Sequence, residues 1–313
     1  MWLRRFTNYL LMHRGQALAL TVLSAMLSLI LPLFGLISIS IALLLTLLKG
    51  AKEGAIFTFA ASFPYLFGFF AGHQVSVPLV IWAGAGAALL TNVLNYVFAL
   101  MLARRTGFSQ LIQIVALMGV LIVSVVHLVY PDVSDWWAET LQAYYSQASK
   151  AFNLLNSIDA KTQTYVLDTI NVTKYYATGF MLAAILTNAI FQLIVARWWQ
   201  ASVFSPGSLK RELHHIRLNS LAGFLFVMGL AFAYMGNVVV LDIMPIPYVL
   251  FGMAGLSLVH YAFGLVYSST RWFWLMIFYF TLIVAMPISM IFVSMLALLD
   301  VWFDLRRKLK KAN

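Results

Sequence analysis

Long apolar runs dominate this chain, and short polar segments separate them. The runs do not alternate apolar and polar residues as membrane β-strands do, so each run predicts a helix. A membrane crossing takes about twenty apolar residues. Runs of about that length or longer lie at residues 16–49, 54–71, 76–103, 109–130, 174–199, 219–237, 246–268 and 272–303.

The first and last runs are too long for a single crossing. Pro32 and Gly35 interrupt the first run, and Pro287 interrupts the last. Because proline removes a backbone donor and breaks a helix, we divide each run into two short helices that either span the membrane or re-enter it. The sequence therefore predicts an all-α, polytopic transmembrane helical bundle of about ten membrane helices (roughly 8–10) in a single membrane domain, 1–313.

Two polar segments stand out between the runs. Residues 131–173 interleave aromatic residues with acidic, Ser, Gln and Asn residues, which is typical of one or two amphipathic helices on the outer surface. Such a segment could cap a cavity or simply connect two membrane helices. Residues 200–218 contain a Ser-Pro-Gly turn and then Leu209, Leu213 and Ile216 at helical spacing, which predicts a short cytoplasmic interfacial helix.

Charged and aromatic residues around residues 200–218 predict an anchor at the membrane surface. The sequence VARWWQ ends an apolar run, where an arginine can snorkel and indoles prefer headgroup depth. The basic residues that follow are expected to face lipid phosphates or a cytoplasmic partner. The predicted interfacial anchor consists of Arg197, Trp198, Trp199, Lys210 and Arg211.

Composition supports a membrane protein. The chain of 313 residues is 63% hydrophobic and only 10% charged, with a mean hydropathy of +0.91. A soluble core does not need so much apolar sequence. The lipid bilayer is therefore the first partner that the sequence predicts.

The distribution of positive charge predicts the orientation. Of the 20 Lys and Arg residues, all but Lys150, Lys161 and Lys174 fall on one side of the ten-helix topology. The positive-inside rule then places both termini in the cytoplasm, and we expect a multi-pass protein of the bacterial cytoplasmic (inner) membrane. The net charge of +10 reflects this orientation, so we expect no nucleic-acid partner.

Catalytic motifs are missing from the sequence. There is no cysteine, and no G-x-S-x-G, H-E-x-x-H or Walker motif. His214 and His215 beside Glu212 suggest a metal, but a di-iron site needs more carboxylates than the three glutamates supply. We expect no enzyme, no cofactor and no metal.

Polar side chains within the membrane runs are few and uncharged. They are Asn92, Asn95, Gln113, Asn188, Gln192 and His260. Counted from the cytoplasmic ends at 1.5 Å per residue, all six lie roughly 8 to 15 Å deep, in one layer. They either line a ligand site or join helices through hydrogen bonds.

A stripe of small residues marks the first run. Ala17, Thr21 and Ala25 repeat at spacings of four, which permits close helix approach. The neighbour is either another helix of the chain or a membrane protein partner.

Two resemblances add to this interpretation. The segment ARWWQ with the following Pro-Gly, Glu212 and Arg217-Leu218, together with the closing LLDVWFDLRRKL, resembles the YybS-like bacterial integral-membrane family, a domain of unknown function. The first half, with two short helices and then LLKGAKEGAIF, is similar to the substrate-binding subunits of energy-coupling-factor transporters. This second resemblance implies about six helices and a vitamin-like ligand near the outer face.

Two functions fit these observations. The first is transport or small-ligand binding, because of the polar layer, the outer segment and the resemblances. The second is a non-enzymatic membrane assembly or partner-binding protein that uses its basic cytoplasmic face.

Overall fold

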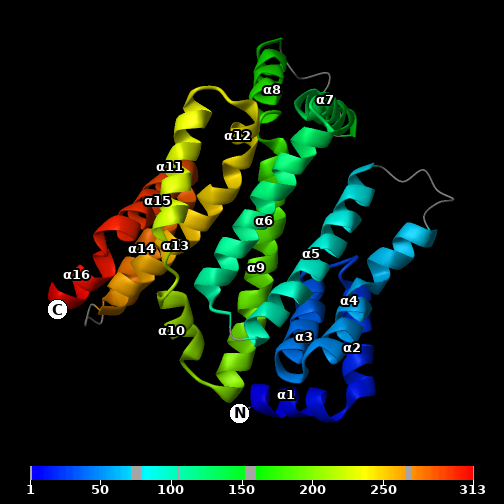
Figure 1. Ribbon diagram of the computed structural model, residues 1–313. Helices are drawn as coiled ribbons and strands as arrows, with labels where there is room; N and C mark the ends of the chain where they lie inside the picture. Colours follow the sequence, from blue (N-terminus) through cyan, green and yellow to red (C-terminus); the bar gives the residue numbers. More distant parts are fainter. Residues whose placement is uncertain (1, 72–78, 105, 152–159, 266–269, 313) are drawn as a thin grey trace. The chain divides into compact units, whose positions relative to one another are not determined.

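The fold is helical throughout the part of the chain that the structure describes. The structure is a computed structural model, and it describes residues 2–71, 79–104, 106–151, 160–265 and 270–312. Sixteen helices and no strand lie within these ranges (Figure 1). The predicted all-α class is therefore confirmed.

The first eight helices lie between residues 2 and 173. Their bounds are α1 Trp2–Met12, α2 Arg14–Leu27, α3 Leu33–Lys49, α4 Ala51–Ala71, α5 Leu79–Ala103, α6 Phe108–Val129, α7 Val133–Ala151 and α8 Ala160–Thr173. The other eight are α9 Ala177–Phe204, α10 Ser208–His214, α11 Ser220–Tyr234, α12 Val238–Ile243, α13 Pro245–Leu265, α14 Arg271–Val284, α15 Met286–Phe303 and α16 Leu305–Ala312.

Both long apolar runs are broken where the sequence predicts. In the first run, α2 ends at Leu27 and α3 begins directly after Pro32. In the last run, α14 ends at Val284 and α15 carries a proline in its first turn. The N-terminal segment is also bent, because α1 and α2 meet at 109°.

Several helices are long and apolar enough to cross a membrane. Within the described ranges there are four, covering residues 82–103, 108–129, 177–204 and 238–265, or up to six if each bent pair at the chain ends counts as one span. The ten-helix topology additionally requires shorter elements such as α3 and α11 to be membrane-embedded. The structure thus supports the membrane class with a smaller number of full-length spans.

The described chain divides into two compact units. Unit 1 comprises residues 1–112 and 185–216, and unit 2 comprises residues 113–184 and 217–313. The boundary passes through α6 and α9, and no proline- or glycine-rich linker marks it in the sequence.

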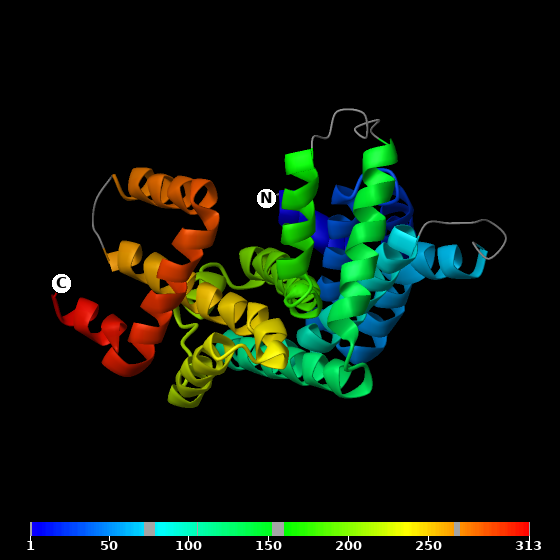
Figure 2. The ribbon, with the colours of Figure 1, turned by 90° about the horizontal axis from the view of Figure 1, so that it is seen from above.

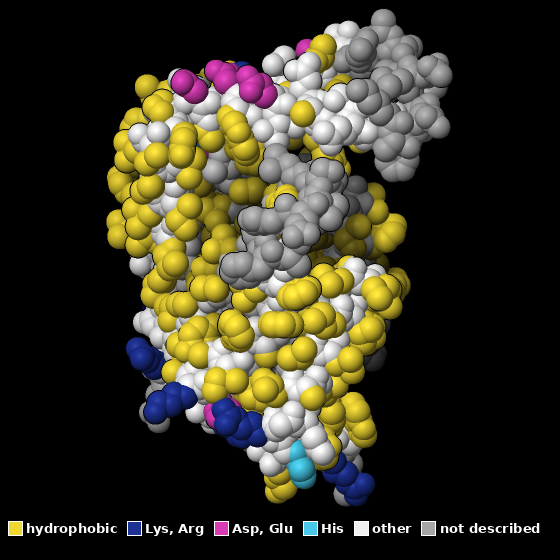
Figure 3. Space-filling model, turned by 90° about the vertical axis from the view of Figure 1, so that its right-hand side faces the viewer, with side chains coloured by type: hydrophobic (Ala, Val, Ile, Leu, Met, Phe, Trp, Pro, Cys, Tyr) yellow, Lys and Arg dark blue, Asp and Glu magenta, His cyan; other side chains and the backbone are white. Residues whose placement is uncertain are grey.

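Unit 1 is built on close packing of α2, α3, α4 and α5 (Figures 1 and 2). A Cβ atom added to Gly54 in α4 would lie only 2.3 Å from Thr46 Oγ1 in α3, so these two helices approach at a glycine. Such contacts through small residues stabilise helix pairs in membranes. Figure 3 shows Lys and Arg side chains gathered at one end of this unit, beside a broad hydrophobic face.

The stripe of small residues on α2 is used inside unit 1. Ala17, Thr21 and Ala25 are all buried, with exposures of 0%, 0% and 1%. Ser38 of α3 donates a hydrogen bond to the Thr21 carbonyl oxygen at 2.9 Å. The stripe therefore lies buried within unit 1, where Thr21 contacts α3 of the same chain, the first of the two alternatives.

Unit 2 has its tightest packing between α13 and α15. Cβ atoms added to Gly252 and Gly255 would lie 2.7 Å from the Met290 side chain and 2.1 Å from the Val293 carbonyl oxygen. The polar segment 131–173 also belongs to this unit. Within it, α7 and α8 pack against each other on either side of residues 152–159, which lie outside the described ranges.

Candidate functional site

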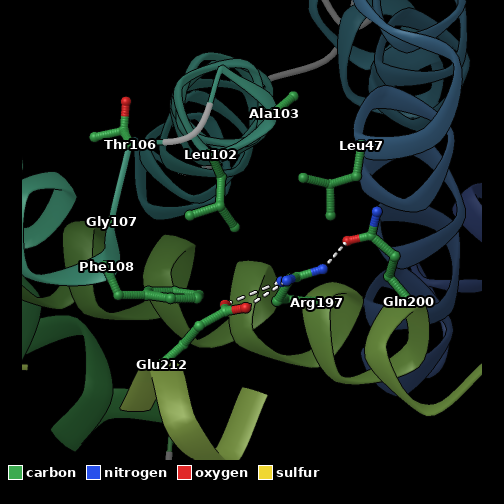
Figure 4. Close-up of a pocket in the computed structure, with 9 residues that line it drawn as sticks. All are labelled: Leu47, Leu102, Ala103, Thr106, Gly107, Phe108, Arg197, Gln200 and Glu212. Carbon is green, nitrogen blue, oxygen red and sulfur yellow. Dashed lines mark hydrogen bonds and ion pairs between the residues drawn. The ribbon is translucent and has the colours of Figure 1, made fainter. Parts of the chain in front are cut away.

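A cavity of about 370 Å³ lies in unit 1, where several helices end or begin (Figure 4). It is bounded by the ends of α3 and α5, the start of α6, α9 and α10. Its lining residues are Leu47, Leu102, Ala103, Thr106, Gly107, Phe108, Arg197, Gln200 and Glu212. Apolar and polar groups share this lining about equally, and the volume falls in the range of roughly 300 to 1,000 Å³ that is typical of small-molecule sites.

The polar wall of this cavity is an ion pair between α9 and α10. Arg197 donates through Nε to Glu212 Oε2 at 3.1 Å and through Nη2 to Glu212 Oε1. Its Nη1 donates to Gln200 Oε1, one turn along α9. The Arg197 and Glu212 side chains are only 19% and 30% exposed. Arg197, which was predicted to snorkel toward headgroups, binds a carboxylate of the same chain in the structure.

A glycine turn brings Glu212 back to Arg197. After α9 ends at Phe204, Gly207 adopts φ of +83°, a left-handed conformation that side chains with a Cβ rarely adopt. The chain then reverses into α10, where Leu209 is buried and Lys210 and Arg211 are exposed. The helix predicted over this segment exists, although α10 is short and its acidic residue faces the cavity.

The ion pair leaves hydrogen-bonding capacity at the cavity. A guanidinium has five N–H donors, and the three bonds given above use three of them. The Arg197 and Glu212 charges cancel, so the polar wall presents donors without net charge. This arrangement suits an uncharged polar or zwitterionic ligand better than a strongly charged one.

An amide cluster lies on α5 and α9, two of the helices that border the cavity. Asn95 Nδ2 in α5 donates to Gln192 Oε1 in α9 at 2.6 Å, and Gln192 Nε2 donates to Asn188 Oδ1 at 3.3 Å. Gln192 precedes Arg197 by five residues, or about 7.5 Å of helix. Three of the six predicted polar residues are thus brought together near the cavity.

The other three predicted residues make separate bonds. Asn92 Nδ2 donates to Ser62 Oγ of α4 at 3.1 Å, within unit 1. Gln113 and His260 belong to unit 2. Gln113 Oε1 accepts weakly from the Asn219 backbone N–H at 3.5 Å, and the His260 ring bonds to the Tyr279 hydroxyl.

The two tryptophans of the predicted anchor have different environments. Trp198 is 55% exposed, as a side chain at the lipid surface would be, whereas Trp199 is only 9% exposed. Trp199 Nε1 donates to Thr7 Oγ1 of α1 at 2.9 Å, and its ring stacks on Phe6. Trp199 therefore holds α1 against α9.

Sequence reasoning missed a buried ionisable pair in unit 2. His127 of α6 and Asp242 of α12 are joined by a hydrogen bond of 2.9 Å, with side-chain exposures of 6% and 2%. Asp242 Oδ1 also accepts from the Gly179 backbone N–H at 2.8 Å. The signals were a single aspartate in the apolar stretch VVVLDIMPIP and a histidine, His127, inside the apolar run 109–130.

A second ionic cluster in unit 2, which the sequence patterns did not predict, joins Arg217 to the closing segment LLDVWFDLRRKL. Arg306 Nε lies 3.0 Å from Asp300 Oδ2, and Arg217 Nη1 lies 3.1 Å from Asp304 Oδ1. Burial lowers the pKa of Arg306, while the Asp300 carboxylate opposes that shift. The cluster fixes the start of α16 against α15.

Comparisons with known proteins do not indicate a function for this chain. No family model, curated protein or solved structure matches this chain. Among the described residues, no group of three or more His, Cys, Asp or Glu side chains could hold a metal ion.

Proposed function

We propose that this chain is a multi-pass bacterial inner-membrane protein that transports or binds a small ligand, and that the cavity beside Arg197 is its ligand site. The single observation that carries this proposal is the placement of a neutralised Arg197–Glu212 pair in the wall of a 370 Å³ cavity otherwise bounded largely by apolar residues. A surface ion pair contributes little to stability. A pair held at a cavity can orient a ligand.

The ligand class follows from the chemistry of the lining. Leu47, Leu102 and Phe108 offer an apolar surface, and the free N–H groups of Arg197 with the Gln200 amide offer donors. We infer a small ligand with an apolar part and carbonyl or carboxylate acceptors. A ligand carboxylate would need its own cationic group, because Glu212 already neutralises Arg197.

We also propose the finer topology of about ten membrane helices with both termini in the cytoplasm. Its support is the charge distribution along the sequence. The chain contains no cysteine, so single cysteines at Gln147 and Lys311 can be labelled without background. An impermeant maleimide should label position 147 in intact spheroplasts and position 311 only after permeabilisation. Equal labelling of both positions before permeabilisation would exclude this topology.

The ligand proposal is tested by thermal stability of the purified protein. A panel of amino acids, nucleobases and vitamins should contain a compound that raises the melting temperature of the wild type. Arg197→Met should abolish that rise, whereas Lys210→Met, an exposed change in the neighbouring helix, should keep it. A rise that persists in Arg197→Met would place the ligand elsewhere, and a panel without any effect would count against this ligand class.

A second candidate function is that of a non-enzymatic assembly protein, within the YybS-like family that the two motifs resemble. One observation favours it: α16 has the sequence LRRKLKKA, and Lys308 and Lys310 are exposed. A chain truncated after Arg307, which keeps the Arg306–Asp300 pair and removes Lys308 and Lys310, should then insert normally but lose its partner in cross-linking. Transport or ligand binding that survives this truncation would separate the two functions.

A further inference from the structure

Three buried oxygen atoms in unit 1 have no hydrogen-bond partner among the described residues. They are Ser40 Oγ of α3, Thr58 Oγ1 of α4 and Asn95 Oδ1 of α5. Their residues are 3%, 7% and 0% exposed. A fourth such atom, Glu53 Oε2, has Arg14 Nε at 3.2 Å and is therefore accounted for by an ion pair. A buried polar atom without a partner loses its hydration without compensation, so three in one bundle need an explanation.

The register of α4 and α5 places two of these atoms at the same level. Asn92 and Ser62 face each other, because Asn92 Nδ2 donates to Ser62 Oγ at 3.1 Å. The two helices are antiparallel (Figure 1). Thr58 lies four residues before Ser62, and Asn95 lies three residues after Asn92, so both lie about one turn from that bond in the same direction.

The register of α3 and α4 brings the third atom to this level. Thr46 opposes Gly54, where a Cβ atom would lie 2.3 Å from Thr46 Oγ1. Six residues back along α3 is Ser40, and six residues forward along antiparallel α4 is Ala60. Ala60 in turn opposes Leu94, since Ser62 opposes Asn92. Ser40 therefore lies within about one residue rise, roughly 1.5 Å, of the level of Asn95.

The three helices also contact one another pairwise. α3 packs on α4, α4 packs on α5, and α3 packs on α5. On a helical wheel of 100° per residue, Thr58 falls between Gly54, which faces α3, and Ser62, which faces α5. Its side chain thus lies on the face of α4 between α3 and α5, the two helices that carry Ser40 and Asn95.

The amide cluster makes Asn95 Oδ1 a strong acceptor. Asn95 donates to Gln192, and Gln192 donates to Asn188, so the carbonyl ends of these amides all point toward Asn95 Oδ1. Hydrogen bonds aligned in this way polarise one another. The negative end of the chain of amides is the buried oxygen that has no donor.

We propose that Ser40, Thr58 and Asn95 form a site for one dehydrated monovalent alkali cation. Hard cations bind oxygen ligands, and backbone or side-chain dipoles can replace an ion's hydration shell inside a membrane. The three protein ligands are uncharged, which suits an ion of single charge. A single cation binds several oxygen ligands at once, so one ion can bind all three atoms. It needs less space than an organic ligand.

This site does not depend on the proposed function. The cation site is built from α3, α4 and α5, whereas the proposed ligand cavity depends on Arg197 and Glu212. A purified protein could therefore bind the cation and no panel compound, or the reverse. The two proposals fail in distinguishable ways.

The test compares melting temperatures of the full-length purified protein in NaCl, KCl and N-methylglucamine chloride at equal ionic strength. Binding of an ion to the folded state alone should raise the melting temperature in NaCl or KCl by roughly 2 to 4 °C relative to the large organic cation. Ser40→Ala and Thr58→Val should each abolish this difference. Because they remove atoms that have no partner, they should cost little stability in N-methylglucamine chloride.

Ser38→Ala is the matched control. It removes another buried hydroxyl of α3, but one that already donates to the Thr21 carbonyl. This variant should lose stability in every salt and keep the alkali-cation effect. Equilibrium binding of radioactive sodium or rubidium to the wild type provides a measurement that needs no variant. The same melting temperature in all three salts, or no bound cation, would overturn the proposal and indicate a water molecule. An alkali-cation effect that persists in both Ser40→Ala and Thr58→Val would overturn this assignment as well.

Discussion

The guanidinium of Arg197 and the carboxylate of Glu212 meet through two parallel N–H···O bonds across the turn between α9 and α10. Fifteen residues separate them in the chain. Both side chains line the same cavity, with Gln200 completing the polar wall (Figure 4). The turn at Gly207 therefore brings together two side chains of the proposed ligand site.

A double-mutant cycle should measure this coupling. We expect Arg197→Met and Glu212→Gln each to destabilise the protein, because each leaves the partner's polar group partly buried and unpaired. The double variant should lose less than the sum of the two, with a coupling of roughly 0.5 to 3 kcal/mol. Reversible denaturation in mixed micelles gives the free energies of unfolding. Strictly additive losses would mean that the pair contributes no interaction.

The amide cluster predicts an order of effects. Gln192 makes two side-chain bonds and Asn188 makes one. Replacement of Gln192 by Leu should therefore destabilise the protein more than replacement of Asn188 by Leu. The interhelical bond to Asn95 should contribute roughly 0.6 to 1.7 kcal/mol, and the bond between Gln192 and Asn188, which lies within one helix, should contribute less. Melting temperatures of the two variants check the order, and a larger loss in Asn188→Leu would contradict it.

The adjacent tryptophans should respond differently to the same change. Trp199→Phe removes the indole N–H that donates to Thr7, so we expect a loss of about 0.5 to 1.5 kcal/mol. Trp198→Phe changes an exposed ring and should have little effect on the folded protein. Thr7→Val should remove the same bond, so combining it with Trp199→Phe should add little. Equal losses in the two tryptophan variants would refute the contact between α1 and α9.

Among the glycines, we expect a methyl group added at Gly179 in unit 2 to destabilise the protein most. A Cβ atom there would lie 1.6 Å from the Asp242 carbonyl oxygen, so Gly179→Ala must displace backbone and should cost at least about 1 to 3 kcal/mol. Gly84→Ala is the control, because no atom lies within 4 Å of its added Cβ and the change reduces the freedom of the unfolded chain. Gly84→Ala should be neutral or slightly stabilising. A tolerated Gly179→Ala would show that α9 and α12 are further apart.

Sequence patterns predicted the features that depend on local chemistry. Pro32 and Pro287 act on their own helices, so the breaks in the two long runs could be read directly. The 3.6-residue period placed Leu209 and Ile216 on a buried face of the segment around α10 for the same reason.

Features that depend on distant partners could not be predicted. Trp198 and Trp199 are adjacent residues of the same type, and the sequence does not show that Thr7, 192 residues away, accepts a hydrogen bond from the second of them. Asp242 finds His127 at a separation of 115 residues. The division into two units follows from such contacts, and the apolar sequence of α6 and α9 does not reveal it.

The most direct test of the central claim is an experimental density map of the protein purified in a mild detergent or a nanodisc. The account predicts density that does not belong to the protein in the cavity bounded by Leu102, Phe108 and Gln200, within hydrogen-bonding distance of Arg197. Adding the compound found by the thermal screen should strengthen that density. A cavity filled by protein side chains, or an Arg197 that turns away from Glu212 into solvent, would contradict the account.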